Sequence, residues 1–298
     1  MKARFQSRAT TISLGIGVVL IWSTCFVTIK LSSLGNEPLT FAAIRALLAG
    51  IVLLILSTLG GCLKPPSNTW PWLAVSALTG TSLALWGMFG SVPIEGSVIA
   101  SILGNSQAIL IAPLAVIFLN EKQTLWRWMC LGIGFLGLLL VIVGKSEGVG
   151  TLGGSLIALL ASVGLAISSL VAKRLSGQMH ALTLTTWQFL LGSIPLVVAA
   201  IIFERPYYFR PTDKALWSLI YLAVISSAGG SFIWNWLLKR IDVTSLTALT
   251  MLGPPTSLLL GLFIFDERVT MIQWAGITIA LVSVTCLQWS EDPSHHDR

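Results

Sequence analysis

Long apolar runs separated by short polar segments fill almost the whole chain. A helix needs about 20 predominantly apolar residues to cross the hydrocarbon core of a bilayer, and ten stretches of the sequence reach approximately that length. The pattern therefore predicts an all-α integral membrane protein with ten transmembrane helices. The expected spans are residues 11–31, 38–59, 70–91, 97–119, 125–143, 152–172, 182–203, 215–237, 243–265 and 271–289.

The second half of the chain repeats the first. Leu39-Thr40 recurs as Leu182-Thr183 at a shift of 143 residues, and Asn120-Glu121-Lys122 matches Asp266-Glu267-Arg268 at a shift of 146. Each half holds five expected spans, so the second should lie upside down in the bilayer, which makes two inverted five-helix repeats. Such folds commonly carry a substrate site where the halves meet. The expected repeats are residues 11–145 and 150–289, with cytoplasmic tails at 1–10 and 290–298.

Composition and charge agree with a membrane protein. Hydrophobic residues make up 55% of the chain and charged residues 10%, against about 25% charged residues in soluble domains. With the N-terminus inside, eleven Lys and Arg residues fall on the cytoplasmic side and six on the other, which places both termini in the cytoplasm. The net charge of +6 follows from this topology, so nucleic acid is not an expected partner.

Polar and aromatic side chains at mid-membrane depth are candidates for substrate binding. Polar groups within spans are costly, and their presence there suggests a function. A small organic ligand requires aromatic faces with a few convergent hydrogen-bonding groups. Ordinary packing and interhelical hydrogen bonds are the alternative, and should account for at least half of these positions. The candidates are Trp22, Ser23, Trp86, Asn105, Gln107, Ser168, Trp234, Asn235 and Thr250.

Arg45 is the only Lys or Arg well inside an expected span, and its counterpart in the second half is Gln188. A guanidinium at this depth can bind a carboxylate or another anion. It can also snorkel or cap carbonyl groups within the bundle, and we expect this structural role. Glu121 and Glu267 lie at equivalent turns between spans, where we expect their carboxylates to satisfy backbone N–H groups at helix starts.

Helix breaks are a further candidate feature. Gly253-Pro254-Pro255 interrupts the ninth expected span, and Pro113 lies in the fourth. Each proline removes backbone hydrogen bonds that lipid cannot replace, so the freed carbonyls should face protein or a wet cavity. A gating hinge and a fixed kink are both consistent with these residues.

Several of these motifs together resemble the EamA-type members of the drug/metabolite transporter superfamily. They are Trp22-Ser23, the stretch from Leu39 to Leu48 with Arg45, Trp187-Gln188, and the two acidic-basic turns. The resemblance implies alternating access around a cavity lined mainly by the first, third, fourth, sixth, eighth and ninth helices. It also implies export of amino acids, other metabolites or toxic compounds across a bacterial inner membrane. Where such chains often carry Gly after the first-helix Trp, this one has Ser23.

Other function classes find little support. The spans show no nucleophile with a base, no metal-ligand cluster and no Gly-rich phosphate loop, so neither an enzyme nor a cofactor is expected. The sequence thus predicts a secondary transporter, an exporter of amino acids or other small metabolites, in a bacterial cell inner (plasma) membrane. A non-transporting assembly partner and, less so, a membrane-embedded enzyme are the alternatives. The expected partners are a small-molecule substrate and the lipid bilayer, and a homodimer is compatible with the sequence.

Energy coupling follows from where the acidic residues lie. All twelve carboxylates fall in loops, span ends or tails, and no His lies in a span. Proton-driven carriers commonly relay protons through such groups inside the membrane. The sequence therefore predicts a facilitator or exchanger, with Glu95 or Glu121 as the exception if either reaches the cavity.

Overall fold

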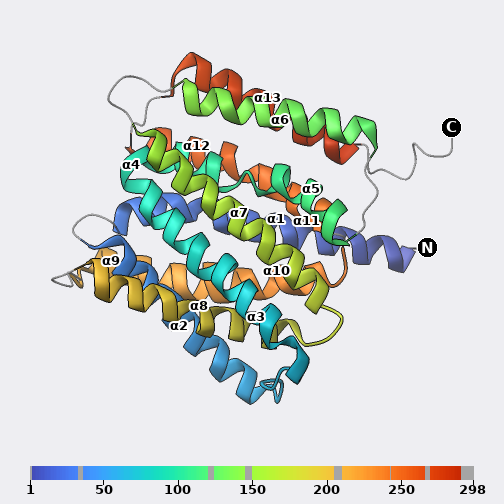
Figure 1. Ribbon diagram of the computed structural model, residues 1–298, viewed down its shortest axis with the longest axis vertical. Coiled ribbons are helices and arrows are strands. Elements are labelled where there is room, and N and C mark those ends of the chain that lie inside the picture. Colours follow the sequence, from blue (N-terminus) through green and yellow to red (C-terminus); the bar gives the residue numbers. More distant parts are fainter. Residues whose placement is uncertain are drawn as a thin grey trace.

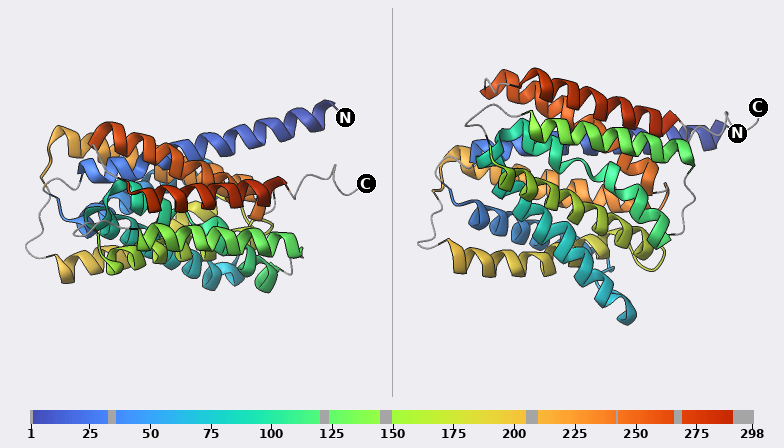
Figure 2. Two further views of the ribbon diagram at one scale, coloured as in Figure 1. Left: turned by 90° about the horizontal axis from the view of Figure 1, so that it is seen from above. Right: turned by 45° about the horizontal axis from the view of Figure 1, so that its top comes forward.

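The computed structural model describes residues 2–32, 36–119, 124–144, 150–204, 210–241, 243–265 and 269–289, and every element in these ranges is helical. The helices form an elongated bundle in which α1 and α7 run in opposite directions (Figure 1). The start of α1 and the end of α13 lie at the same end of the bundle (Figure 2). The expected all-α architecture is confirmed. The elements are α1 (Lys2–Ser32), α2 (Pro38–Leu59), η1 (Ser67–Thr69), α3 (Trp70–Ala77), η2 (Leu78–Leu83), α4 (Ala84–Gly104), α5 (Gln107–Leu119), α6 (Leu125–Val143), α7 (Leu152–Leu175), α8 (Ala181–Phe203), α9 (Asp213–Ile220), η3 (Tyr221–Gly230), α10 (Ser231–Leu238), α11 (Val243–Ala248), η4 (Leu249–Leu252), α12 (Gly253–Phe265) and α13 (Met271–Trp289).

Six helical stretches of the described chain are long and apolar enough to cross a membrane. The other expected spans contain four shorter apolar helices. The protein is therefore a multi-pass membrane protein, while the count of ten spans stays a prediction. The long stretches are Thr10–Ser32, Pro38–Leu59, Ser67–Gly104, Leu152–Leu175, Ala181–Phe203 and Asp213–Leu238, and the short helices are Ile109–Phe118, Trp128–Val143, Thr256–Phe265 and Met271–Ser283.

Gly96 divides the longest of these stretches. Its φ of 79° lies in the left-handed region, and the backbone of α4 kinks there. Glycine adopts this conformation at no steric cost, because it has no Cβ. The kink falls between the expected third span at 70–91 and the expected fourth span at 97–119, so it marks the boundary that the apolar pattern predicted.

Two kinds of helix irregularity occur at matching places in the two halves. The expected fourth span is broken at Asn105-Ser106, between α4 and α5, and the expected ninth is broken by the 3-10 turn η4. At the shift of 146 residues Asn105 corresponds to position 251, inside η4. The third and eighth spans contain the π-helical segments η2 and η3, and Leu78–Leu83 corresponds to 224–229, inside η3. Such segments often occur at functional sites.

The helices pack in pairs that join the two halves. α2 lies along α8, α4 lies along α7, and α1 contacts η3, η4 and α12. α6 and α13 lie side by side at the edge of the bundle (Figures 1 and 2). A Cβ built on Gly137 would lie 2.7 Å from the carbonyl oxygen of Gly276, so these two backbones touch because both residues are glycine.

Two acidic side chains cap helix starts. The Glu204 carboxylate accepts hydrogen bonds from the backbone N–H groups of Leu39 and Thr40, each at 2.7 Å, at the beginning of α2. Glu95 Oε1 accepts from the backbone N–H of Thr151 at 3.1 Å, just before α7. Negative charge is favourable at a helix N-terminus. Glu121 and Glu267, for which the same role was expected, lie outside the described residues.

Candidate functional site: a central cavity with two chambers

Two adjoining chambers lie inside the bundle. The first, which we call the Arg45 chamber, has about 570 Å³ of space not filled by protein atoms, solvent-open space included, and the second, the Gln188 chamber, has about 400 Å³. They share the walls formed by Trp22, Gly80, Gln107, Leu165 and Ser231, so they are parts of one cavity. Residues of the Arg45 chamber alone include Cys25, Phe26, Arg45, Leu85, Met88, Asn105, Phe189, Ser226 and Ser227, and those of the Gln188 chamber alone are Ser168, Ser169, Gln188, Trp234 and Asn235.

The cavity walls come from both halves of the chain. As the family resemblance implies, the first, third, fourth, sixth and eighth expected spans contribute residues. The second and seventh also contribute, through Arg45 and through Phe189 and Gln188. Among the described lining residues none comes from the ninth span, although Gly253 at its break lies close to Asn105.

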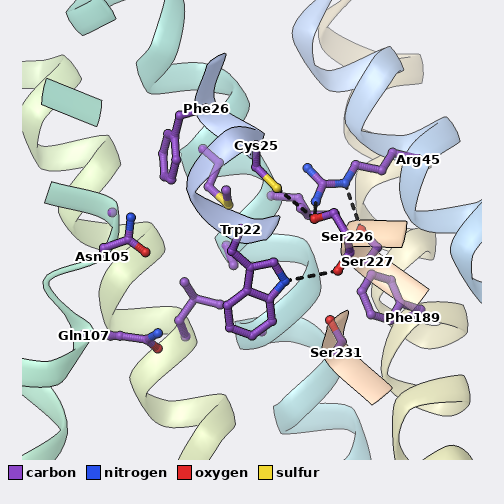
Figure 3. A pocket seen from close by; sticks show the side chains of 16 residues that line it. Trp22, Cys25, Phe26, Arg45, Asn105, Gln107, Phe189, Ser226, Ser227 and Ser231 are labelled. Atoms are coloured by element: carbon purple, nitrogen blue, oxygen red, sulfur yellow. Dashed lines mark hydrogen bonds between the residues drawn. The ribbon is translucent and has the colours of Figure 1, made fainter. Parts of the chain in front are cut away.

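Arg45 provides the only cationic side chain among the described lining residues. It is 3% exposed, and its guanidinium donates to two serine hydroxyls, from Nε to Ser227 Oγ at 2.9 Å and from Nη2 to Ser226 Oγ at 3.3 Å (Figure 3). Its Nη1 has no hydrogen-bond partner among the residues that the structure describes. A buried cation normally finds partners for all its donors, so this atom has unused binding capacity.

The π-helical segment η3 organises the serine side of this chamber. It carries Ser226 and Ser227 opposite Arg45, and the Ser226 carbonyl oxygen accepts a hydrogen bond from Trp22 Nε1 at 3.1 Å. The Ser226 hydroxyl also lies 2.8 Å from Cys25 Sγ. A Cβ built on Gly230 would lie 2.8 Å from Trp22 Nε1, so glycine at this position gives the indole room to approach.

Trp22 lies between the polar groups of the cavity. Figure 3 shows the Asn105 and Gln107 amides on one side of its ring and the Arg45 cluster on the other. The ring centroid of Trp22 is 4.9 Å from that of Trp234 in the Gln188 chamber. Movement of this one side chain would alter the passage between the two chambers.

The Gln188 chamber holds a network of neutral polar groups. Asn235 Nδ2 donates to Thr185 Oγ1 at 3.0 Å and to Gln188 Oε1 at 3.4 Å. Gln188 Nε2 in turn donates to Ser168 Oγ at 3.4 Å. A Cβ on Gly80 would overlap Ser168 Oγ, so glycine in η2 permits this close packing. The amide groups of Gln188 and Asn235 therefore bond to each other and to neighbouring hydroxyls.

Equivalent positions of the two halves build the two chambers. At a shift of 143 residues Arg45 corresponds to Gln188 and Cys25 to Ser168, and at a shift of 146 Gly80 corresponds to Ser226. Each pair contributes one member to each chamber, apart from Gly80, which lines both. The sites thus share a framework and differ in charge.

Gln107 offers a second group with unused binding capacity. It follows the break between α4 and α5, is 2% exposed, and its Oε1 has no hydrogen-bond partner among the described residues. The neighbouring Asn105 differs, because its Nδ2 donates to the Ser101 carbonyl oxygen at 2.9 Å and to Ser101 Oγ at 3.1 Å.

Six of the nine candidate binding residues line the cavity, and three do not. Ser23 Oγ donates to the Val19 carbonyl at 2.7 Å and Thr250 Oγ1 to the Thr247 carbonyl at 2.6 Å, so both bond locally along the chain. Trp86 packs against an apolar cluster. Those that line the cavity are Trp22, Asn105, Gln107, Ser168, Trp234 and Asn235.

The candidate hinge residues have different surroundings. Pro113 lies inside α5, and Gly253 begins α12, where a Cβ would lie 3.2 Å from Asn105 Nδ2. The side chains of Pro254 and Pro255 lie outside the described part of the structure. The gating role stays a prediction.

Sequence reasoning did not single out several other residues of the cavity wall. Cys25, Phe26, Ser226 and Ser227 line the Arg45 chamber without having been candidates. Cys25 and Phe26 follow Trp22 by three and four residues, which is the spacing of one helix face, and this signal could have found them. Ser226 and Ser227 depend on the π-helical register of η3, which the sequence pattern did not reveal.

Comparisons with known proteins relate the whole chain to membrane transporters. The family model described as "EamA-like transporter family" matches residues 9–143 and 152–289. An uncharacterized transporter of Synechocystis sp. is 27% identical over 93% of this chain and 89% of its own length. The uncharacterized transporter YoaV of Bacillus subtilis is 24% identical over 86% and 89%. A solved crystal structure shares the fold, with a TM-score of 0.73 and 17% identity over 95% of this chain and 97% of that chain.

Proposed function

Because the chain belongs to the EamA-like transporter family, we propose that it exports small organic metabolites, amino acids among them, by alternating access through the central cavity. The relatives described above are named transporters, so the chain is a membrane transporter and not an enzyme. The proposal therefore concerns the substrate, the direction and the mechanism.

The single observation that carries the proposal is a cavity whose walls come from both halves. An inverted repeat of two five-helix units, at residues 11–145 and 150–289, accounts for the cavity and for the opposite directions of α1 and α7 (Figure 1). Discontinuous helices near the midplane are a recurrent feature of transporter substrate sites. The breaks at Asn105-Ser106 and in η4, together with the π segments η2 and η3, fit that pattern.

The proposed location is a bacterial cell inner (plasma) membrane, with both termini in the cytoplasm. The distribution of Lys and Arg between the loops supports this orientation. The start of α1 and the end of α13 lie at one end of the bundle, which is compatible with it (Figure 2). The described lining residues of the cavity all belong to one chain, and a homodimer is compatible with this arrangement.

We infer facilitated exchange rather than proton-driven transport. The described lining residues of both chambers contain no carboxylate and no histidine. Glu95 and Glu204 are engaged at helix starts, away from these walls. Transport in liposomes should equilibrate equally with and without an imposed pH gradient. Uphill accumulation driven by the gradient and lost in Glu95→Gln would refute this inference.

Counterflow in liposomes tests the transport function itself. The purified protein should exchange labelled amino acids or other small metabolites with saturable kinetics, and Trp22→Ala should reduce this exchange because the indole lies between the chambers. Trp126→Ala is the matched control, since Trp126 is half exposed on α6 at the edge of the bundle. Absence of exchange by correctly folded protein would favour the assembly-partner alternative, and product formation would favour an enzyme.

A further inference from the structure

The cation in the central cavity is bound in a different manner from a structural lysine in the same protein. Lys173 Nζ donates to two backbone carbonyls, those of Leu238 at 2.8 Å and Ile241 at 2.6 Å, at the end of α10. Arg45 donates to hydroxyls, and its Nη1 lacks a partner among the described residues. A purely structural role would use every donor of a buried guanidinium, because an unsatisfied one is costly.

The serine partners of Arg45 suit an anion. A hydroxyl that accepts a hydrogen bond from arginine still has its own proton to donate. Ser227 can therefore turn its O–H group toward a negatively charged oxygen beside Nη1, and Ser226, whose hydroxyl also contacts Cys25 Sγ, can do so when the Cys25 thiol is the donor. The described walls of the chamber contain no Asp or Glu that would occupy this place. A cation with additional donors and no counter-ion in its walls is a built anion site.

A second group that can bind a ligand lies in the same chamber. Gln107 Oε1, without a partner among the described residues, can accept a hydrogen bond from a ligand. Apolar side chains form much of the remaining wall, among them Phe26, Leu85, Met88 and Phe189. The chamber thus combines an anion-binding end at Arg45, an apolar lining and a neutral hydrogen-bond acceptor at Gln107.

From this arrangement, and resting on the proposed transport function, we propose that the substrate is a small organic monoanion. Its carboxylate binds Arg45, Ser226 and Ser227, its apolar body fills the chamber, and a hydroxyl or amide N–H donates to Gln107. A zwitterion would bring an ammonium group into a chamber whose described walls offer it no carboxylate. The site should therefore prefer a hydroxy acid to the amino acid of the same skeleton.

Three probes with one carbon skeleton test this preference. They are 3-phenyllactate, a monoanion with a hydroxyl, phenylalanine, a zwitterion, and 3-phenylpropane-1,2-diol, which is neutral. In counterflow and in thermal-shift measurements on the purified protein, 3-phenyllactate should be recognised at least about tenfold better than either of the others. Equal recognition of 3-phenyllactate and phenylalanine would overturn the proposal, and so would failure of all three while other solutes are exchanged. Absence of exchange of every solute would instead refute the transport function.

Two substitutions show whether the named groups set the preference. Arg45→Gln should remove the advantage of 3-phenyllactate over the diol, while Arg240→Gln, which removes an exposed cation stacked on Trp236, should leave it unchanged. Gln107→Glu keeps the shape of the side chain and adds a carboxylate, so it should raise recognition of phenylalanine relative to 3-phenyllactate. If Arg45→Gln fails to fold, Gln107→Glu alone decides, and an unchanged ratio in that variant overturns the proposal.

Discussion

The Arg45 chamber and the Gln188 chamber contain residues at corresponding positions of the two halves of the chain, yet only one holds a cation among its described walls. In the Gln188 chamber the amide groups of Gln188 and Asn235 bond to each other and to nearby hydroxyls. In the Arg45 chamber Nη1 of the guanidinium is left without a partner in the described structure, and so is Oε1 of Gln107, which lines both chambers. The amides that belong to the Gln188 chamber alone bond to each other, whereas the Arg45 chamber holds a cation with an unused donor.

This difference separates what the fold determines from what the side chains determine. Arg45 on α2 faces η3, and Gln188 on α8 lies beside η2, so in both places a polar residue of one half meets a π-helical segment of the other. Exchange of one side chain then converts a neutral hydrogen-bonding site into an anion site. Substrate selectivity in this protein should accordingly change through a few positions, with the helix packing unaltered.

Arg45→Gln makes the two chambers alike and should have the largest effect. Hydrogen bonds to a charged group contribute about 1.5–3 kcal/mol, so exchange of a monoanion should fall by roughly 100-fold. Counterflow of 3-phenyllactate measures the loss, and Arg240→Gln serves as the control for removal of a positive charge. A loss below about threefold in folded protein would mean that the guanidinium is structural.

Exchanging the two residues sharpens the comparison further. The double variant Arg45→Gln/Gln188→Arg moves the cation to the equivalent position of the other half, beside Ser168 and Asn235. Anion exchange should recover by roughly tenfold over Arg45→Gln alone, because one charge-assisted contact of about 1.4 kcal/mol is regained in a site with different hydroxyls. No recovery, with the protein folded by thermal shift, would show that the chambers are not interchangeable.

Asn235→Leu tests the neutral chamber. The change keeps similar bulk but removes the donor to Thr185 and Gln188, and unsatisfied buried acceptors cost about 1–3 kcal/mol. Transport should fall by about tenfold while expression stays normal. Thr250→Val is the control, because the Thr250 hydroxyl is buried and bonds only locally along the chain. Unchanged kinetics would make Asn235 a packing residue.

Ser226→Ala should have the smallest effect. It removes the longer of the two serine contacts to Arg45, 3.3 Å against 2.9 Å for Ser227, and a single hydrogen bond contributes on the order of 1 kcal/mol. Anion exchange should fall by roughly threefold to fivefold. Ser57→Ala is the matched control, since Ser57 is buried and bonds to Thr186 on the α2–α8 contact, outside the cavity. An equal loss in both variants would point to a general packing defect.

The sequence predicted most of the helices because their existence depends on apolar length, which is a local property. It also placed Trp22, Asn105 and Asn235 in the cavity, because polar and aromatic groups at mid-membrane depth require protein neighbours. It could not predict the direction in which Arg45 points from α2, because the rotation of α2 about its axis is set by packing against α8 and η3. Nor could it distinguish Ser23, which bonds the carbonyl four residues earlier, from Ser226, which meets Arg45 across the bundle.

The π-helical segment η3 has a consequence for sequence alignment and engineering. An α-helix turns by about 100° per residue, so insertion or deletion of one residue rotates everything that follows it by that angle. Loss of one residue between Tyr221 and Gly230 would carry Trp234 and Asn235 away from the Gln188 chamber, although the composition of the span would hardly change. Homologous sequences should therefore be aligned with a one-residue gap allowed at this segment, and chimeras joined across it should conserve its length.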